Sequence, residues 1–327
     1  MKPRALVTGA TGFVGSHVAR ALCAQGHAVR VWRRPGSDAR ALAGLAVEEV
    51  TGDLFDIAAL ARACAGCDWL FHVAAAAQYW RLPVETVYRV NVEGTRAVLA
   101  AARRAGVARV VLTSSGAAVG FRADGAPADE RIPFNLPPGA FPYGHSKWLA
   151  EEIAREAAAE GMDVVIVNPS AVLGPGDLNR VSGDLVVRVA RGQVWLAAPG
   201  GMGVIDVRDA AAAHLAAAER GRPGERYILN AHNVSTRELI ALAARVAGVG
   251  PPRVTLPRAL VGAAALLVDA GRALRVPVPL NGDQLRLSAR GIYFDAGKAR
   301  RELGLATRPL EETVQDTWSW YRAEGVL

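Results

Sequence analysis

Apolar and polar positions alternate in blocks along the first half of the chain, and these blocks predict a repeat of strands and helices. Each short apolar run that reads as a strand is followed by a segment with helical spacing, which favours a parallel sheet with helices on both faces. The predicted strands are 5–7, 28–32, 47–50, 69–74, 109–113 and 164–167, and the two longest predicted helices are 91–105 and 143–160. The pattern therefore predicts an α/β fold with a doubly wound sheet.

The first predicted strand runs directly into a glycine turn. Gly9, Gly12 and Gly15 have G-x-x-G-x-x-G spacing, and helical spacing begins at Ser16. Strand, glycine turn and helix in this order form a site for a dinucleotide pyrophosphate, because glycines allow a close approach and the helix start offers free N–H groups. The residues expected to contact a dinucleotide here are Gly9, Thr11, Gly12, Phe13, Val14 and Gly15. A turn that serves packing alone is the alternative.

From about Gly174 the regular alternation ends. Glycine and proline become dense, and strands predicted at 204–207 and 227–229 alternate less regularly with helices. Ser235 and Glu238 form a capping box that predicts the start of a helix, and a late strand and helix are predicted over 293–303. We therefore predict a Rossmann-type dinucleotide-binding domain over 1–173 and a smaller α/β substrate lobe over 174–327, with a chain that can cross back between the two.

Composition narrows the class of protein and its partners. A hydrophobic content of 51% and a charged content of 21% fit a globular protein. The net charge of +7 comes from scattered residues, so no nucleic-acid partner is expected. Cys64 and Cys67 lack the further ligands that a metal site needs, so no metal is expected. The run 259–268 is too short to span a bilayer and no signal peptide is visible, so we expect a cytoplasmic protein and leave peripheral membrane contact open.

The end of the second predicted strand indicates which dinucleotide binds. An NAD site usually carries an acidic residue there, which bonds the ribose 2′-hydroxyl. This chain has Arg33 and Arg34 at that place, and the next carboxylate is Asp38. Arginine pairs with a 2′-phosphate through charge-assisted hydrogen bonds. The sequence thus predicts NADP(H) rather than NAD(H), with Arg33 as the leading contact and Arg34 beside it; a solvated loop arginine is the alternative.

Tyr143 and Lys147 suggest proton transfer. On a helix their spacing of four places both side chains on one face. An ammonium close to a phenol lowers the phenol pKa from about 10 toward neutrality. Such a tyrosine can exchange a proton with a substrate oxygen, and Ser115, at the end of the preceding strand, can bond the same oxygen.

A glycine turn, Ser115, Tyr143 and Lys147 in this order resemble the short-chain dehydrogenase/reductases. The form of the glycine turn, the chain length and the second lobe are similar to the extended branch, which contains the NAD-dependent epimerases and dehydratases. Three stretches are similar to the dihydroflavonol-reductase-like group and to bacterial proteins labelled hopanoid-associated sugar epimerases: Arg-Val-Val-Leu-Thr-Ser-Ser115, Val-Asn-Pro-Ser170 with Gly174-Pro175, and Phe294-Asp295 through Lys298.

The resemblance implies a role for each of these residues. Tyr143 would be the catalytic acid/base, Lys147 would lower its pKa and bond the nicotinamide ribose, and Ser115 would orient the carbonyl or alcohol. Asn91 would support a proton relay, unless it only caps its helix. The resemblance also places Asp53 and Leu54 beside the adenine, Val73, Ala74, Ala75 and Thr113 along the cofactor, and Asn168, Pro169 and Ser170 beside the nicotinamide. Asp53 could instead only close a turn.

These observations predict an NADP(H)-dependent oxidoreductase that reduces a ketone or aldehyde by hydride transfer. Four aromatic residues suggest a small, fairly apolar substrate: Tyr79, Trp80, Phe141 and Trp195. A nucleotide-sugar epimerase or dehydratase with tightly bound NAD is the first alternative, although such enzymes typically read Phe-Asn where this chain has Asn168-Pro169. A non-catalytic dinucleotide sensor is the second. The extended branch usually pairs the helices at 91–105 and 143–160 between subunits, so a homodimer is expected.

Overall fold

A computed structural model describes residues 2–252, 254–274 and 282–327. Its large sheet consists of β1 (Ala5–Thr8), β2 (Val29–Arg33), β3 (Val47–Thr51), β4 (Trp69–His72), β5 (Arg109–Thr113), β6 (Val164–Pro169) and β10 (Arg226–Leu229). Across the described residues these seven strands are parallel, in the order β10-β6-β5-β4-β1-β2-β3. Strands covered on both faces read as continuous apolar runs, which is why the sequence pattern locates them.

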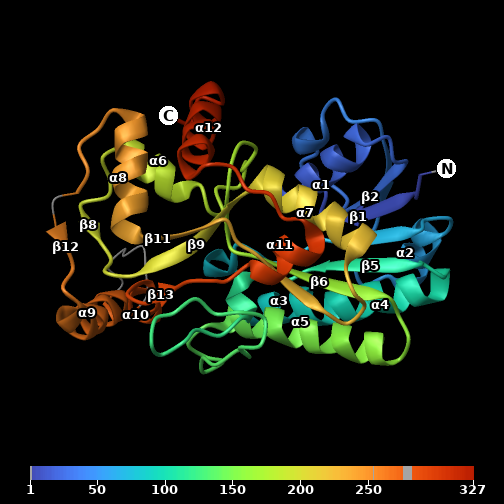
Figure 1. Cartoon of the computed structure of the whole chain (residues 1–327), viewed down its shortest axis with the longest axis horizontal. Coiled ribbons are helices and arrows are strands. Elements are labelled where there is room, and N and C mark those ends of the chain that lie inside the picture. Colours follow the sequence, from blue (N-terminus) through green and yellow to red (C-terminus); the bar gives the residue numbers. More distant parts are fainter. Residues whose placement is uncertain (1, 253, 275–281) are drawn as a thin grey trace.

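Helices cover both faces of this sheet (Figure 1). One face carries α1 (Phe13–Ala24), α7 (Val207–Arg220) and α11 (Gly297–Leu303), and the other carries α2 (Ile57–Cys64), α4 (Gly94–Ala105) and α5 (Pro142–Ala159). The prediction of a doubly wound α/β fold is confirmed. The elements α7, β10 and α11 come from the second half of the chain and complete the large sheet and one of its helical layers.

A smaller sheet lies beyond the carboxyl ends of the large one. It contains β7 (Ala171–Leu173), β9 (Gly201–Asp206), β11 (His232–Ser235) and β13 (Gly291–Ile292). The helices α6 (Asp184–Ala190), α8 (Thr236–Ala247) and α12 (Leu310–Ala323) form its apolar core, and the lobe also carries β8 (Leu196–Ala197), β12 (Val254–Thr255), α9 (Val261–Ala273) and α10 (Gly282–Ser288). The predicted capping box is present at the start of α8, where Ser235 and Glu238 bond each other's backbone N–H.

Two helix starts differ from the prediction. The first helix begins at Phe13 rather than Ser16, because Gly12 is its extended N-cap and Gly15 lies inside it. The segment predicted as one helix from Asn91 is preceded by α3 (Val84–Tyr88) and a π-helical turn at Arg89–Glu93, so α4 starts only at Gly94. Short 3-10 turns occupy Arg40–Leu42, Tyr79–Arg81, Gly116–Ala118 and Arg258–Leu260. Helices in the described ranges all fall short of the length and apolar character required to cross a membrane.

Candidate active site

Most of the predicted site residues lie at the carboxyl edge of the large sheet. The glycine turn follows β1, the loop 73–75 follows β4, Ser115 follows β5, and Asn168 lies near the end of β6. Neighbouring parallel strands point the same way, so these four segments share one edge, where such sheets bind ligands. The arrangement brings the predicted cofactor and catalytic residues together.

The glycine turn is held tightly against this edge. Gly9 has a φ of +69°, which favours glycine, and a Cβ there would lie 2.5 Å from the backbone nitrogen of Ala74. A Cβ on Gly15 would lie 2.2 Å from the carbonyl oxygen of Gly9, so both residues need to be glycine for packing. A Cβ on Gly12 would meet only the Gly9 carbonyl oxygen, at 3.2 Å, and packing constrains this position far less.

The start of α1 fits the pyrophosphate of a dinucleotide. Gly12 caps the helix without a side-chain hydrogen bond, and the first turn contains no acidic residue. The backbone N–H groups of Phe13 and Val14 therefore face no capping group, and the helix dipole favours an anion at this end. Thr11 is half-buried in the same turn. The residues present thus fit a bound dinucleotide.

Arg33 ends β2 as expected, and it has a partner that the sequence did not reveal. Its Nε lies 2.6 Å from a carboxylate oxygen of Glu49, on the adjacent strand β3. The next residue, Arg34, is exposed. A partly exposed ion pair of this kind contributes at most about 1 kcal/mol, so Arg33 can exchange Glu49 for a phosphate at little cost.

The predicted adenine and channel residues follow the strands on either side of these two points, β3 and β4. Asp53 is exposed and accepts a hydrogen bond from the backbone N–H of Phe55 at 3.0 Å, so one of its oxygens does close a turn. Leu54 is buried. The backbone of Val73 and Ala74 bonds Thr8 at the end of β1, which holds the loop 73–75 against the glycine turn.

Ser115, Tyr143 and Lys147 meet at the carboxyl end of β5. Tyr143 and Lys147 lie on α5, and the Ser115 hydroxyl is close enough to hydrogen-bond the Tyr143 phenolate, which lowers the pKa of that phenol. The Lys147 ammonium is buried and donates to the backbone carbonyl of Thr113 at 2.7 Å. The Thr113 hydroxyl bonds the buried ring of His214, so only its backbone faces the catalytic group.

The pKa of Tyr143 differs from the value that its spacing from Lys147 predicts. Burial raises the pKa of Tyr143 to about 12, and the Ser115 hydrogen bond opposes this rise only in part. Burial also lowers the pKa of Lys147 to about 8. The prediction that Lys147 lowers the pKa of the Tyr143 phenol toward neutrality is therefore wrong for this structure. The Lys147 ammonium bonds the Thr113 carbonyl oxygen, and burial determines the pKa of the phenol. Tyr143 remains protonated at neutral pH.

Asn91 is fully engaged in holding other elements. It lies in the π-helical turn, accepts a hydrogen bond from the backbone N–H of Ala76 at 2.8 Å, and donates to the Ser146 hydroxyl at 2.9 Å. It does not cap a helix. These bonds tie the loop after β4 to α5, one residue before Lys147.

The residues at the end of β6 are buried. The Asn168 amide donates to the Ser115 carbonyl oxygen at 2.9 Å, while its own carbonyl oxygen has no partner. The Ser170 hydroxyl is also buried without a partner. Pro169 ends β6 between them. An unpaired buried hydroxyl at this edge is consistent with a ligand that supplies the missing hydrogen bond.

Three of the four predicted pocket aromatics gather near Tyr143. The Tyr79 ring stacks on Tyr143 with centroids 4.8 Å apart, and it contacts Trp80 and Phe141 edge-on. Trp195 does not join this group and is 80% exposed in the second lobe. The space above the Tyr143 phenol is thus aromatic, and Trp195 belongs to a different surface.

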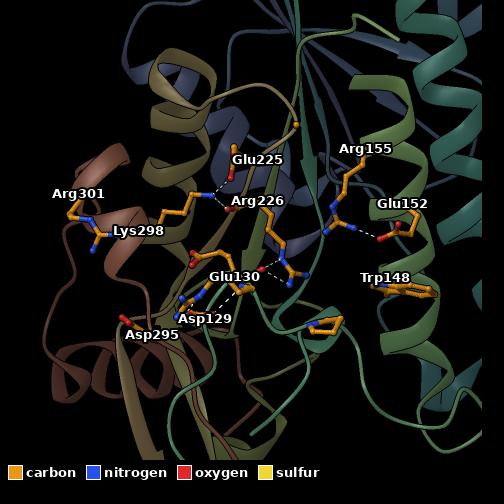
Figure 2. Close-up of a pocket in the computed structure, with 13 residues that line it drawn as sticks. Asp129, Glu130, Trp148, Glu152, Arg155, Glu225, Arg226, Asp295, Lys298 and Arg301 are labelled. Carbon is orange, nitrogen blue, oxygen red and sulfur yellow. Dashed lines mark hydrogen bonds and ion pairs between the residues drawn. The ribbon is translucent and has the colours of Figure 1, made fainter. Parts of the chain in front are cut away.

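A cavity of about 760 Å³ lies elsewhere, between α5 and α11 (Figure 2). Charged side chains line it, and they pair largely with one another: Arg131 with Asp129, Arg155 with Glu152, and Lys298 with Glu225. Ser115, Tyr143 and Lys147 are not among its lining residues. This cavity is therefore not the reaction site, although Arg226 in its wall reaches toward the base of that site.

Sequence reasoning missed one residue of this region. Glu151 is completely buried on α5, in contact with Ser114, Asn168 and Arg226. Its spacing of four from Lys147 was a readable signal, because it places a carboxylate on the same helical face.

Comparisons with known proteins agree with this geometry. A family model described as the NAD dependent epimerase/dehydratase family matches residues 5–230. The chain is 39% identical over 331 residues to a Synechocystis sp. protein named "Putative dihydroflavonol 4-reductase", with 98% of this chain and 95% of that protein covered. It is 36% identical over 326 residues to sterol demethylase protein B of Methylococcus capsulatus, covering 98% and 99%. The solved structure of PA4631, a nucleoside-diphosphate-sugar epimerase from Pseudomonas aeruginosa, is 32% identical with a TM-score of 0.85, and both chains are covered completely.

Proposed function

The chain belongs to the NAD-dependent epimerase/dehydratase family, and we propose that it acts there as an NADPH-dependent reductase of a small, fairly apolar ketone or aldehyde. It is an NAD(P)-dependent oxidoreductase of the extended short-chain dehydrogenase/reductase type. The observation that carries the proposal is the meeting of Ser115, Tyr143 and Lys147 beside the glycine turn, with Tyr143 held protonated.

The bound nicotinamide would supply a hydride to the carbonyl carbon. Ser115 would hold the substrate oxygen, and Tyr143 would donate the phenolic proton to that oxygen as charge develops on it. A phenol with a pKa of about 12 is protonated at neutral pH, which suits an acid for reduction rather than a base for oxidation. The Lys147 ammonium would bond the nicotinamide ribose and stabilise the phenolate left after proton transfer.

The remaining predicted residues would hold the cofactor. The pyrophosphate would lie on the N–H groups at the start of α1, and Asp53 and Leu54 would border the adenine. The loop 73–75 would line the channel, and the unpaired hydroxyl of Ser170 would face the nicotinamide end. Asn91 would act by holding Ala76 and Ser146 in place.

Arg33 is proposed to select NADPH, and its substitution gives a direct test. Arg33→Ala should raise the Kd for NADPH about tenfold and leave the Kd for NADH nearly unchanged, because only NADPH carries the 2′-phosphate. Glu49→Gln should leave Arg33 free and lower the Kd for NADPH. Both constants are measured by fluorescence titration, with Arg62→Ala on the exposed side of α2 as a control. An equal rise in Kd for NADPH and for NADH in Arg33→Ala would contradict the assignment.

An apolar substrate is supported by the aromatic residues above the phenol and by relatives named for dihydroflavonol and sterol chemistry. Tyr79→Ala should therefore raise KM for an aromatic carbonyl about tenfold while kcat changes less than about threefold, because the ring contributes apolar contact and no proton. Steady-state kinetics with benzaldehyde derivatives measure both constants. Trp195→Ala is the matched control, since that ring is 80% exposed and lies on a different surface. A loss confined to kcat would contradict a binding role.

We also propose a homodimer that pairs α4 and α5 between subunits, a cytoplasmic location, and a functional division into 1–173 and 174–327. Light scattering of the purified protein tests the dimer. The division leaves α7 and β10 on the sheet of the first part, although they follow residue 174.

Purified protein tests the reaction. It should load NADPH and consume it with a panel of aromatic and aliphatic aldehydes and ketones. The likeness to the Pseudomonas sugar epimerase makes epimerisation the competing function, and retained NAD with turnover of a nucleotide sugar would favour it. Cofactor binding without turnover of either substrate class would favour a sensor.

A further inference from the structure

We propose that Glu151 is a positioning residue of this active site. Its carboxylate fixes the strand end that carries Ser115 against the helix that carries Tyr143 and Lys147, and its negative charge stabilises the Lys147 ammonium. The inference rests on the proposed function for the roles of those three residues, and it adds a residue that touches neither cofactor nor substrate.

The carboxylate of Glu151 is saturated with donors. Oε1 accepts hydrogen bonds from the Ser114 hydroxyl and the Asn168 amide, each at 2.5 Å. Oε2 accepts from Arg155 at 2.7 Å and from Arg226 at 3.1 Å. The side chain has no exposed surface, and two of the four donors that bond its oxygens are guanidinium groups.

Two of these donors belong to the catalytic edge of the sheet. Ser114 immediately precedes Ser115 at the end of β5, and Asn168 also donates to the Ser115 carbonyl oxygen at 2.9 Å. Lys147 and Tyr143 lie four and eight residues before Glu151 on α5, so all three share one helical face. One carboxylate therefore joins the ends of two strands to the helix that bears the proposed proton donor.

Arg226 and Arg155 provide the positive charge next to the other carboxylate oxygen of Glu151. Arg226 is buried on β10, and it also donates to the carbonyl oxygens of Glu130 and Ile132. Figure 2 shows Arg226 and Arg155 extending toward each other from the strand and from α5. A carboxylate needed only to neutralise Arg226 would not require its other oxygen to bond Ser114 and Asn168.

Glu151 is also the acidic group that acts on Lys147. The ammonium is buried against the Thr113 carbonyl oxygen of β5 and lies near His72 of β4, and Tyr143 precedes it by one helical turn. Burial lowers the pKa of His72 to about 3, so this ring is neutral, and Tyr143 is a neutral phenol. Burial lowers the pKa of Lys147 to about 8, and the charge of Glu151 opposes that decrease. Without this charge, Lys147 would lose its proton at a lower pH.

Glu151→Gln tests the proposal, with Glu156→Gln as the matched control on the exposed side of the same helix. The Kd for NADPH is measured by fluorescence over the neutral and alkaline range. Wild-type binding should weaken as pH rises through about 8, and the Glu151→Gln profile should move down by about one pH unit, the usual effect of losing an opposite charge nearby. Glu156→Gln should leave the profile unchanged. With the best carbonyl of the panel, Glu151→Gln should lower kcat about tenfold near neutral pH with little change in KM.

A Glu151→Gln protein that melts earlier but keeps the wild-type pH profile and kcat would overturn the proposal, because Glu151 would then be structural only. If that variant does not fold, Ser114→Ala removes one hydroxyl donor and leaves every charge in place. It should lower kcat about threefold or more with an unchanged Kd for NADPH, and a wild-type kcat would overturn the positioning role. If no carbonyl is reduced, the proposed function fails, whereas the NADPH profile still decides the role of Glu151.

Discussion

Replacing Tyr143 with phenylalanine is expected to lower kcat for carbonyl reduction about a thousandfold, within the usual range for the loss of a general acid. The substitution removes the phenolic proton and keeps the ring that stacks on Tyr79. Folding and cofactor binding should therefore be preserved, with a Kd for NADPH within about twofold of the wild-type value. Steady-state rates and fluorescence titration measure the two effects separately.

Tyr79→Phe is the matched control for this result. It removes a hydroxyl from the ring stacked 4.8 Å away, and it should change kcat by less than about threefold because that hydroxyl is assigned no proton transfer. If Tyr79→Phe loses as much activity as Tyr143→Phe, the assignment of the proton donor is wrong. If Tyr143→Phe keeps most of its activity, the protein does not use the proposed mechanism.

Gly12→Val is expected to weaken NADPH binding about a hundredfold or more, while the free energy of unfolding changes little. Gly12 has ordinary extended backbone angles, and its Cβ would meet only the Gly9 carbonyl oxygen, at 3.2 Å. The free protein can therefore accept a side chain there with a shift of a few tenths of an ångström at that carbonyl. A pyrophosphate on the start of α1 could not approach the backbone past the added methyl groups.

The same experiment separates cofactor binding from a packing role of the glycine turn. Gly250→Val is the control, because no atom lies within 4 Å of a Cβ at that position. Gly9→Ala gives the contrasting result, since its Cβ would lie 2.5 Å from Ala74 and should destabilise the fold itself. Titration of NADPH and thermal melts of the three variants are compared. Unchanged NADPH binding by Gly12→Val would show that the turn does not hold the pyrophosphate.

The fold could be predicted from the sequence because its strands are buried on both faces and its first turn requires glycine at two positions. The apolar runs at 5–7 and 164–167 locate β1 and β6 within two residues. The pairing of β10 with β6 could not be predicted from the sequence. The two strands are separated by 56 residues, and the local spacing of apolar residues contains no information about a pairing over that distance. The start of α1 was misplaced because the packing of Gly15 against Gly9 is a tertiary contact.

In the candidate site, too, local spacing predicted some features, and others depend on contacts that form only in the folded chain. Tyr143 and Lys147 could be paired from their spacing on one helix, and Ser115 from its place at a strand end. The partner of Arg33 was not predictable, because Glu49 lies on another strand. The pKa of Tyr143 was mispredicted because burial and the carbonyl partner of Lys147 depend on the folded chain. The π-helical turn at Asn91 has no sequence period of its own.

The central claim is that this protein transfers a hydride from NADPH to a carbonyl carbon. NADPH deuterated at the transferring position of C4 is mixed with the protein and the best carbonyl of the panel, and the alcohol is analysed by mass spectrometry. The account predicts one deuterium on the carbinol carbon and one NADPH oxidised for each alcohol formed. No alcohol and no NADPH oxidation, with protein that retains NAD and interconverts a nucleotide sugar, would contradict it and indicate an epimerase.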